Sequence, residues 1–179
     1  TDLCKNKAAC IVTFLDGKDK NSLNYKNCYE VGKNIGKLHK ASSKIKLYRK
    51  NSMSINSLDS LLKSIKFKSK KIDSSLKTVL KINLKEIKKE WPKNLPKGII
   101  HGDLFIDNIF FNKNKFAGFI DFYFSCNDYL MYEIAICINA LCFDKKNNKF
   151  TINKKKVKNL IKGYQSIKKI SKKEKNALN

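Results

Sequence analysis

Apolar side chains recur at helical spacing along much of the chain. Over residues 25–41 they stand three or four positions apart, which predicts an amphipathic helix with an apolar face of Cys28, Val31, Ile35 and Leu38. The same pattern predicts further helices near 57–66, near 72–90, over 128–143, over 154–168 and from 171 onward. The polar segment 42–56 is expected to be a loop, and Pro92 and Pro96 follow a helix end because proline cannot extend a helix.

Short apolar runs rich in β-branched and aromatic residues predict a few strands. Residues 9–17, ACIVTFLDG, end in a turn signal and predict a buried strand, and we expect no strand before residue 9. Strands are also predicted within GIIHGD, NIFFN and FAGFIDFYF, with NKNK at 112–115 as the turn between the last two. A helical body with a few short strands, without repeats or a domain linker, is an α+β arrangement.

Composition narrows the class of protein. A chain of 179 residues with 42% hydrophobic residues can form one domain with a sizeable core. No apolar run approaches 18 residues, so we expect no membrane-spanning helix. None of the six cysteines forms a CxxC pair, and those at 10, 28, 137 and 142 lie in apolar patterns. This favours buried cysteines in a reducing cytoplasm over a disulfide framework or a zinc site.

The net charge of +24 would suit a nucleic-acid-binding protein, but its distribution does not. Arg49 is the only arginine, the lysines are spread over the whole chain, and no nucleic-acid-binding motif is present. Nucleic acid is therefore not the expected partner. One region departs from the basic background: residues 99–144 contain six acids and two lysines.

The acidic region contains a catalytic-loop pattern. Residues 101–108, HGDLFIDN, fit H-x-D-x-x-x-x-N, the loop of kinase-like phosphotransferases, and Asp121 follows at the end of an apolar run. In that chemistry, an aspartate such as Asp103 orients the acceptor hydroxyl and takes its proton. Oxygens of Asn108 and Asp121 suit Mg²⁺, a hard cation. The hairpin between them would bring both to the same end of the strands.

Other polar residues of this region have structural alternatives. We interpret His101 as a histidine that supports the loop through backbone hydrogen bonds. Asp128 and Glu133 could charge the start of the helix expected at 128–143, where acids favour the positive end of the dipole.

Several stretches, in order, resemble the aminoglycoside phosphotransferase/choline kinase-like superfamily, and within it the homoserine kinase family. They are IVTFLDG, VGKNIGKLHKAS, WPKNLPKGIIHGDLFIDNIFF, FAGFIDFYFSCNDYLMYEIAICINALCFD and LIKGYQSIKKISKKEKNAL. The resemblance covers most of the chain and is weakest over 42–90. The DFYFSCND and GYQS stretches favour homoserine kinase over a choline, sugar or aminoglycoside kinase, which remain the alternatives.

This resemblance implies a protein-kinase-like fold and transfer of the γ-phosphate of ATP to the hydroxyl of L-homoserine. It implies Asp103, Asn108 and Asp121 as catalytic residues, with the latter two holding Mg²⁺. Backbone groups at Thr13, Phe14 and Leu15 would meet the adenine. Tyr123 and Asp128 are candidates for the substrate site beside Asp103, with packing of the loop as the rival role.

The resemblance also implies parts that the chain lacks. Family members have an N-terminal lobe with a glycine-rich phosphate loop and a phosphate-binding lysine, whereas Gly32 and Gly36 fall on a predicted helix. We therefore expect residues 1–24 to be a hinge strand and linker, and 25–179 a truncated helical C-terminal lobe. We expect the isolated chain to be inactive.

Overall fold

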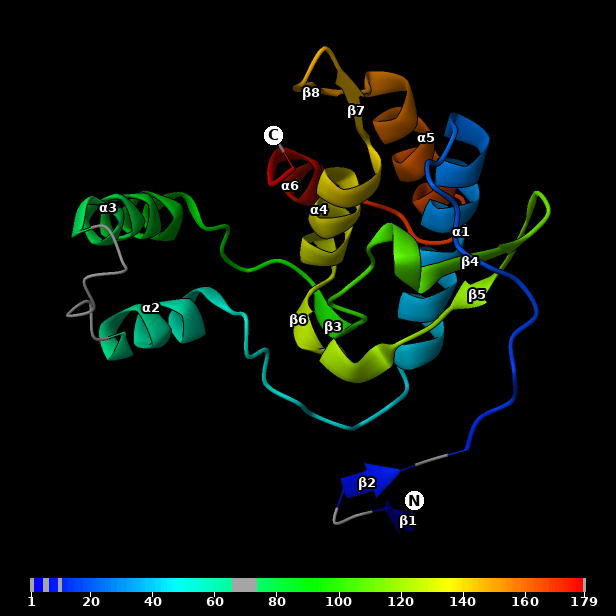
Figure 1. The fold of residues 1–179 in the computed structure, drawn as a ribbon, viewed down its shortest axis with the longest axis horizontal. Helices are drawn as coiled ribbons and strands as arrows, with labels where there is room; N and C mark the ends of the chain where they lie inside the picture. The colour runs from blue at the N-terminus through cyan, green and yellow to red at the C-terminus, as the bar shows by residue number, and fades with distance from the viewer. Residues whose placement is uncertain (1, 5–6, 10, 66–73, 179) are drawn as a thin grey trace.

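The computed structural model describes residues 2–4, 7–9, 11–65 and 74–178 (Figure 1). The helices are α1 (Tyr25–Ser42), α2 (Ile55–Ser64), α3 (Ser74–Glu90), α4 (Leu130–Leu141), α5 (Lys154–Gln165) and α6 (Lys172–Asn176). The strands are β1 (Asp2–Cys4), β2 (Lys7–Ala9), β3 (Lys97–Ile100), β4 (Ile109–Asn112), β5 (Lys115–Phe119), β6 (Cys126–Tyr129), β7 (Phe143–Lys146) and β8 (Lys149–Ile152). Two 3₁₀ turns, η1 (Ile106–Asn108) and η2 (Phe122–Phe124), lie beside β4 and β6.

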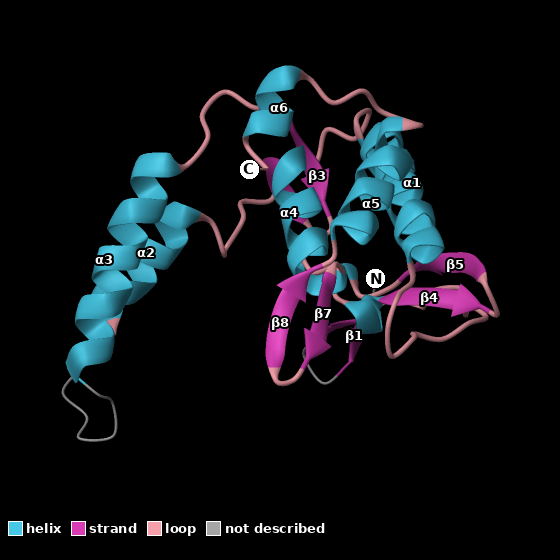
Figure 2. Cartoon of the chain, turned by 90° about the horizontal axis from the view of Figure 1, so that it is seen from above, coloured by secondary structure: helices cyan, strands magenta, loops and turns pink. Residues whose placement is uncertain are grey.

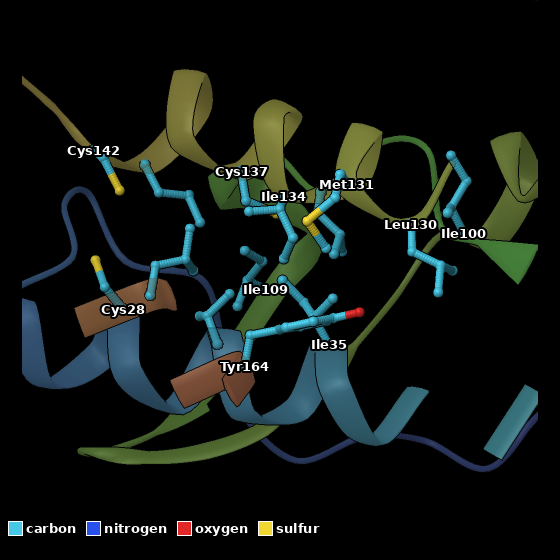
Figure 3. Packing of buried hydrophobic residues seen from close by; sticks show 14 of the residues in the cluster. Cys28, Ile35, Ile100, Ile109, Leu130, Met131, Ile134, Cys137, Cys142 and Tyr164 are labelled. Atoms are coloured by element: carbon cyan, nitrogen blue, oxygen red, sulfur yellow. The ribbon is translucent and has the colours of Figure 1, made fainter. Parts of the chain in front are cut away.

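The core lies between α1, α4 and α5 and against the strands of the catalytic region (Figure 3). Helix α1 begins where predicted, because Asn24 caps it and accepts hydrogen bonds from the backbone N–H groups of Lys26 and Asn27. Its predicted apolar face is buried at Cys28, Val31 and Ile35. The face packs against Leu160 and Tyr164 of α5 and Ile134 and Cys137 of α4, among other apolar residues.

Glycines allow α1 and α5 to approach at backbone distance. A Cβ atom at Gly32 would lie 2.0 Å from the carbonyl oxygen of Leu160, and one at Gly163 would lie 2.0 Å from the carbonyl oxygen of Tyr29. The two glycines face opposite helices, so the contact is reciprocal.

We expect Gly163→Ala to lower the free energy of unfolding by about 3 kcal/mol, because the backbone of α1 must move away to admit the methyl group. This cost exceeds the gain of about 1 kcal/mol in helix propensity. Urea unfolding followed by circular dichroism measures it. Gly98→Ala is the control, because its methyl group would meet only the side chain of Leu130. Equal stabilities of the two variants would contradict the close helix contact.

The strands form four two-stranded antiparallel pairs, β1–β2, β3–β6, β4–β5 and β7–β8. The hairpin β4–β5 turns at Lys113 and Asn114, within the predicted turn. The hairpin β7–β8 was not predicted. Its turn residues Asn147 and Asn148 both have positive φ, of 50° and 58°, as a tight two-residue hairpin requires.

Helices α2 and α3 pack side by side and project from the rest of the chain (Figures 1 and 2). Their facing apolar side chains line a groove that includes Leu58, Leu62, Leu84 and Ile87. Across one edge, Asp59 lies 2.9 Å from both Lys63 and Lys88, and these cations hold the pKa of its carboxyl below the ordinary value.

Four predictions about the elements are wrong. The strand expected over 9–17 is absent from 11–17, whose Ile11, Val12 and Phe14 are exposed, because among the described residues no strand runs beside 11–15 to satisfy its backbone. The antiparallel pair β1–β2 begins before residue 9, at Asp2, and ends at Ala9. The start of the helix expected at 128–143 is strand β6, because β3 pairs with it. The sequence FYF is the turn η2.

The described cysteine side chains are free, as predicted. Cys28, Cys126, Cys137 and Cys142 are buried, and the hydrogen bond from Cys142 lowers the pKa of the Cys28 thiol. Figure 3 shows the sulfur atoms of Cys28 and Cys142 facing each other. Cys10 lies outside the described residues. In the part of the chain that is described, no helix is long and apolar enough to cross a membrane.

Candidate active site

The predicted catalytic loop follows β3 and lies in close contact with η2. Gly102 has a φ of 81°, a conformation that glycine adopts without strain. A Cβ atom there would lie 2.9 Å from the carbonyl oxygen of Phe124. Glycine is therefore required both by the turn and by the close contact, and Asp103 follows directly.

His101 is fully buried and makes two hydrogen bonds through its ring. Its Nε2 lies 2.8 Å from the carbonyl oxygen of Ile120, and its Nδ1 lies 3.3 Å from the backbone nitrogen of Asp103. Because a carbonyl only accepts and a backbone N–H only donates, the ring carries its proton on Nε2. In this neutral form His101 links the catalytic loop to the residue before Asp121.

The buried carboxylate of Glu133 binds the backbone of the catalytic loop. Oε2 of Glu133, on α4, accepts the N–H of His101 at 2.5 Å, and Oε1 accepts the N–H of Gly102 at 3.1 Å. Glu133 lies in the first turn of α4, as expected of an acid at a helix start, and its side chain is 0% exposed. Both carboxylate oxygens fix the two residues that precede Asp103.

Two further buried residues lie next to Glu133 in a chain of contacts: His39 contacts Glu133, and Tyr164 contacts His39. His39 of α1 is 3.8 Å from Oε2 of Glu133 through Nε2, and its Nδ1 lies 3.0 Å from the hydroxyl of Tyr164 on α5. Burial raises the pKa of Tyr164, so it stays a neutral hydroxyl. His39 belongs to no motif of the sequence, but its position four residues after Ile35 places it on the apolar face of α1.

Asn108 contacts Asp103 directly. Its Nδ2 donates to the backbone oxygen of Asp103 at 2.8 Å and to Oδ2 of Asp103 at 3.2 Å. Both partners only accept, so the amide nitrogen must face Asp103 and the amide oxygen faces away. Among the described residues, that oxygen has no hydrogen-bond donor, which leaves it available to a cation.

Asp121 is brought to Asn108 by the hairpin β4–β5. The backbone N–H of Ile120 donates to the carbonyl oxygen of Asn108 at 3.1 Å, so Asp121 begins next to η1. Asp121 has φ 58° and ψ 64°, and its Oδ1 accepts the N–H of Tyr123 at 3.3 Å. Oδ2 has no partner among the described residues. An amide oxygen and a carboxylate oxygen on adjoining turns fit a hard cation such as Mg²⁺.

The remaining predicted residues lie on other segments. Thr13 and Phe14 are exposed, whereas Leu15 packs against Gly118 of β5. Tyr123 is exposed in η2. Asp128 lies in β6, where its Oδ2 accepts from Nδ2 of Asn51 at 2.6 Å and its Oδ1 from the backbone N–H of Tyr129 at 2.7 Å. Through Asn51, the carboxylate of Asp128 therefore holds the loop before α2 against β6.

Known proteins are similar to this chain in sequence. The chain is 36% identical over 172 residues to homoserine kinase of Sinorhizobium fredii and 38% identical to that of Mesorhizobium japonicum. Each match covers 96% of this chain but only 52% and 53% of the relative, so the chain spans about half their length.

Solved structures of phosphotransferases superpose on the chain. An amicoumacin kinase in complex with AMP-PNP and Ca²⁺ matches with a TM-score of 0.65 at 15% identity, covering 87% of this chain and 48% of that one. A choline kinase from Cryptosporidium parvum matches with a TM-score of 0.56 at 20% identity, covering 86% and 52%. The predicted α+β, protein-kinase-like fold is thus confirmed. Residues 2–149 match the phosphotransferase enzyme family, to which this chain therefore belongs.

Proposed function

We propose that the protein is a small-molecule kinase that transfers the γ-phosphoryl group of ATP to the hydroxyl of L-homoserine. The observation that carries this proposal is the arrangement of Asp103, Asn108 and Asp121. An amide oxygen of Asn108 and a carboxylate oxygen of Asp121, both without a partner among the described residues, lie on turns next to the loop of Asp103. The homoserine kinase relatives support the choice of acceptor, and the free cysteines agree with a reducing, cytoplasmic setting.

Asp103 would accept a hydrogen bond from the substrate hydroxyl and take its proton as the phosphoryl group transfers. Glu133 and His101 hold the backbone N–H groups of residues 101–103, so the position of this carboxylate does not depend on the substrate. Asn108 and Asp121 would hold Mg²⁺, which supplies charge stabilisation to the phosphates. Most of the rate enhancement in such chemistry comes from positioning and electrostatics.

The segment 13–15 would meet the adenine through its backbone. It adjoins the catalytic hairpin because Lys18 and Phe111 exchange two backbone hydrogen bonds, at 3.1 and 2.8 Å. Tyr123 and Asp128 would face the acceptor, Asp128 through its negative charge toward the substrate ammonium group.

The choice of acceptor is tested by assaying the full-length protein for ATP-dependent phosphorylation of L-homoserine, choline and an aminoglycoside. We expect turnover with L-homoserine and a far lower kcat/KM with the other two. The second candidate function, a kinase for another small alcohol, is supported by the choline kinase fold match and would replace the first if choline were the better substrate.

We expect Asp121→Ala to abolish the Mg²⁺ dependence of ATP binding and Asn108→Ala to weaken it about tenfold, because a neutral amide contributes less than a carboxylate to holding a cation. Titration of ATP at several Mg²⁺ concentrations measures this. The control is Asp107→Ala, which removes an exposed carboxylate one residue before Asn108. Overlapping titrations of all variants and the wild type would contradict the metal assignment.

A further inference from the structure

The only arginine of the chain lies beside the catalytic region. Arg49 belongs to the loop between α1 and α2, and its backbone makes two hydrogen bonds with Asn127 of β6. The N–H of Arg49 donates to the side-chain Oδ1 of Asn127, and the N–H of Asn127 donates to the backbone oxygen of Arg49, both at 2.8 Å. The loop is thereby fixed along β6, next to Asp128.

The guanidinium group reaches the turn that follows Asp121. Its Nη1 donates to the backbone oxygens of Tyr123 at 2.5 Å and Ser125 at 3.4 Å, and its centre lies 5.7 Å from the ring of Tyr123. The residue between these two carbonyls, Phe124, is the one whose oxygen touches Gly102. The guanidinium is therefore held at the turn that lies directly on the catalytic loop.

Part of this guanidinium remains free to bind. Nε and Nη2 of Arg49 make no hydrogen bond to any described residue, and the side chain is exposed. Arg49 also lines a groove of about 410 Å³ together with Leu47, Tyr48, Ile99, Ser125 and Asn127. Because Nη1 is tied to two carbonyls, the free edge has a defined direction, which suits bidentate binding of a carboxylate.

We propose that Arg49 binds the α-carboxylate of the amino-acid acceptor and so determines that the kinase acts on an amino acid rather than on a simple amino alcohol. This inference rests on the proposed function and names a residue for its specificity. Asp128, on the paired strand, provides the opposite charge for the ammonium group. The α-carboxylate of a zwitterion would then meet Arg49 and its ammonium group Asp128.

Lysines elsewhere on the surface do not offer the same site. The rest of the chain is rich in lysine, but a flexible ammonium group does not present two parallel donors. The hydrogen bonds from Nη1 to the turn hold the side chain of Arg49 before the substrate binds, so less side-chain entropy is lost on binding.

The experiment compares L-homoserine with 3-aminopropan-1-ol, which has the same hydroxyl and ammonium group but no carboxylate. In the full-length wild-type protein, kcat/KM for L-homoserine should exceed that for 3-aminopropan-1-ol by about 100-fold, as expected for a charge-assisted bidentate pair. In Arg49→Gln this preference should fall about 10- to 100-fold through the loss of L-homoserine turnover alone. Lys50→Gln removes one charge from the neighbouring position and should keep the wild-type preference. Arg49→Lys retains the positive charge but not the two parallel donors, so its preference for L-homoserine should lie between those of the wild type and Arg49→Gln.

Each outcome separates the two proposals. Loss of L-homoserine turnover with unchanged 3-aminopropan-1-ol turnover supports the role of Arg49. An equal loss with both substrates would show that Arg49 only holds the turn, and a wild type that does not distinguish them would show that no carboxylate is recognised. Either result overturns this inference and leaves the kinase proposal in place. Absence of L-homoserine phosphorylation in the wild type would overturn the proposed function itself. If Arg49→Gln does not fold, the wild-type preference and Arg49→Lys still decide.

Discussion

Replacing Asp103 by asparagine should lower turnover with L-homoserine by about 10²- to 10⁴-fold, the range expected for loss of a general base. The substitution keeps the shape of the side chain and removes its capacity to take a proton. The remaining carbonyl oxygen can still accept the hydrogen bond that Asn108 donates, now 3.2 Å long, so the loop should keep its structure. Steady-state rates of the full-length protein measure the effect.

Affinity for ATP should change little in Asp103→Asn, because this side chain is assigned to the acceptor hydroxyl and not to the phosphates. Isothermal titration with Mg-ATP checks this. Asp107→Asn is a matched control, since it neutralises an exposed carboxylate four residues away. A rate within tenfold of wild type for Asp103→Asn would reject its role as the base.

Glu133→Gln should destabilise the fold by about 3 kcal/mol and also lower turnover by about 100-fold, although the two side chains have nearly the same shape. The carboxylate accepts hydrogen bonds from two backbone N–H groups, those of His101 and Gly102. A glutamine has one acceptor oxygen and an NH₂ group, so one of the two N–H groups would face a donor. The loop before Asp103 should then shift.

Glu174→Gln is the control for removing a buried carboxylate. Glu174 is also buried, but it accepts the N–H and hydroxyl of Ser171 at the start of α6 through one oxygen, Oε2, which a glutamine keeps. Glu174→Gln should therefore unfold near the wild-type urea concentration, and only Glu133→Gln should lower kcat under conditions where the protein is folded. Normal kcat in folded Glu133→Gln would reject a positioning role.

The local patterns were sufficient for most helices and for the catalytic hairpin. The apolar spacing of α1 and the polar turn at 112–115 both act within a few residues, so they can be recognised without knowing the rest of the fold. The spacing of Asp103, Asn108 and Asp121 was informative for the same reason, because a loop and one hairpin connect all three.

Long-range pairing explains the errors. Residues 128 and 129 were assigned to the helix expected over 128–143, but β3 pairs with them from about thirty positions away and makes them part of strand β6. Residues 11–15 have the composition of a strand, but no described strand pairs with them, and a strand needs a partner for its backbone groups.

The sequence by itself determined the class of fold, the acidic motif and the order of its reactive residues, because these depend on short-range spacing and on which side chains suit the chemistry. Only the tertiary structure decided the roles of Glu133, His39 and Arg49. Glu133 is the helix-start acid that the sequence predicted, but only the fold shows that it is buried against the catalytic loop and accepts two of its N–H groups. Arg49 looked like one cation among many until the fold brought it against the turn after Asp121. Side chains from distant segments acquire such roles only where packing places them together, and local spacing carries no record of that contact.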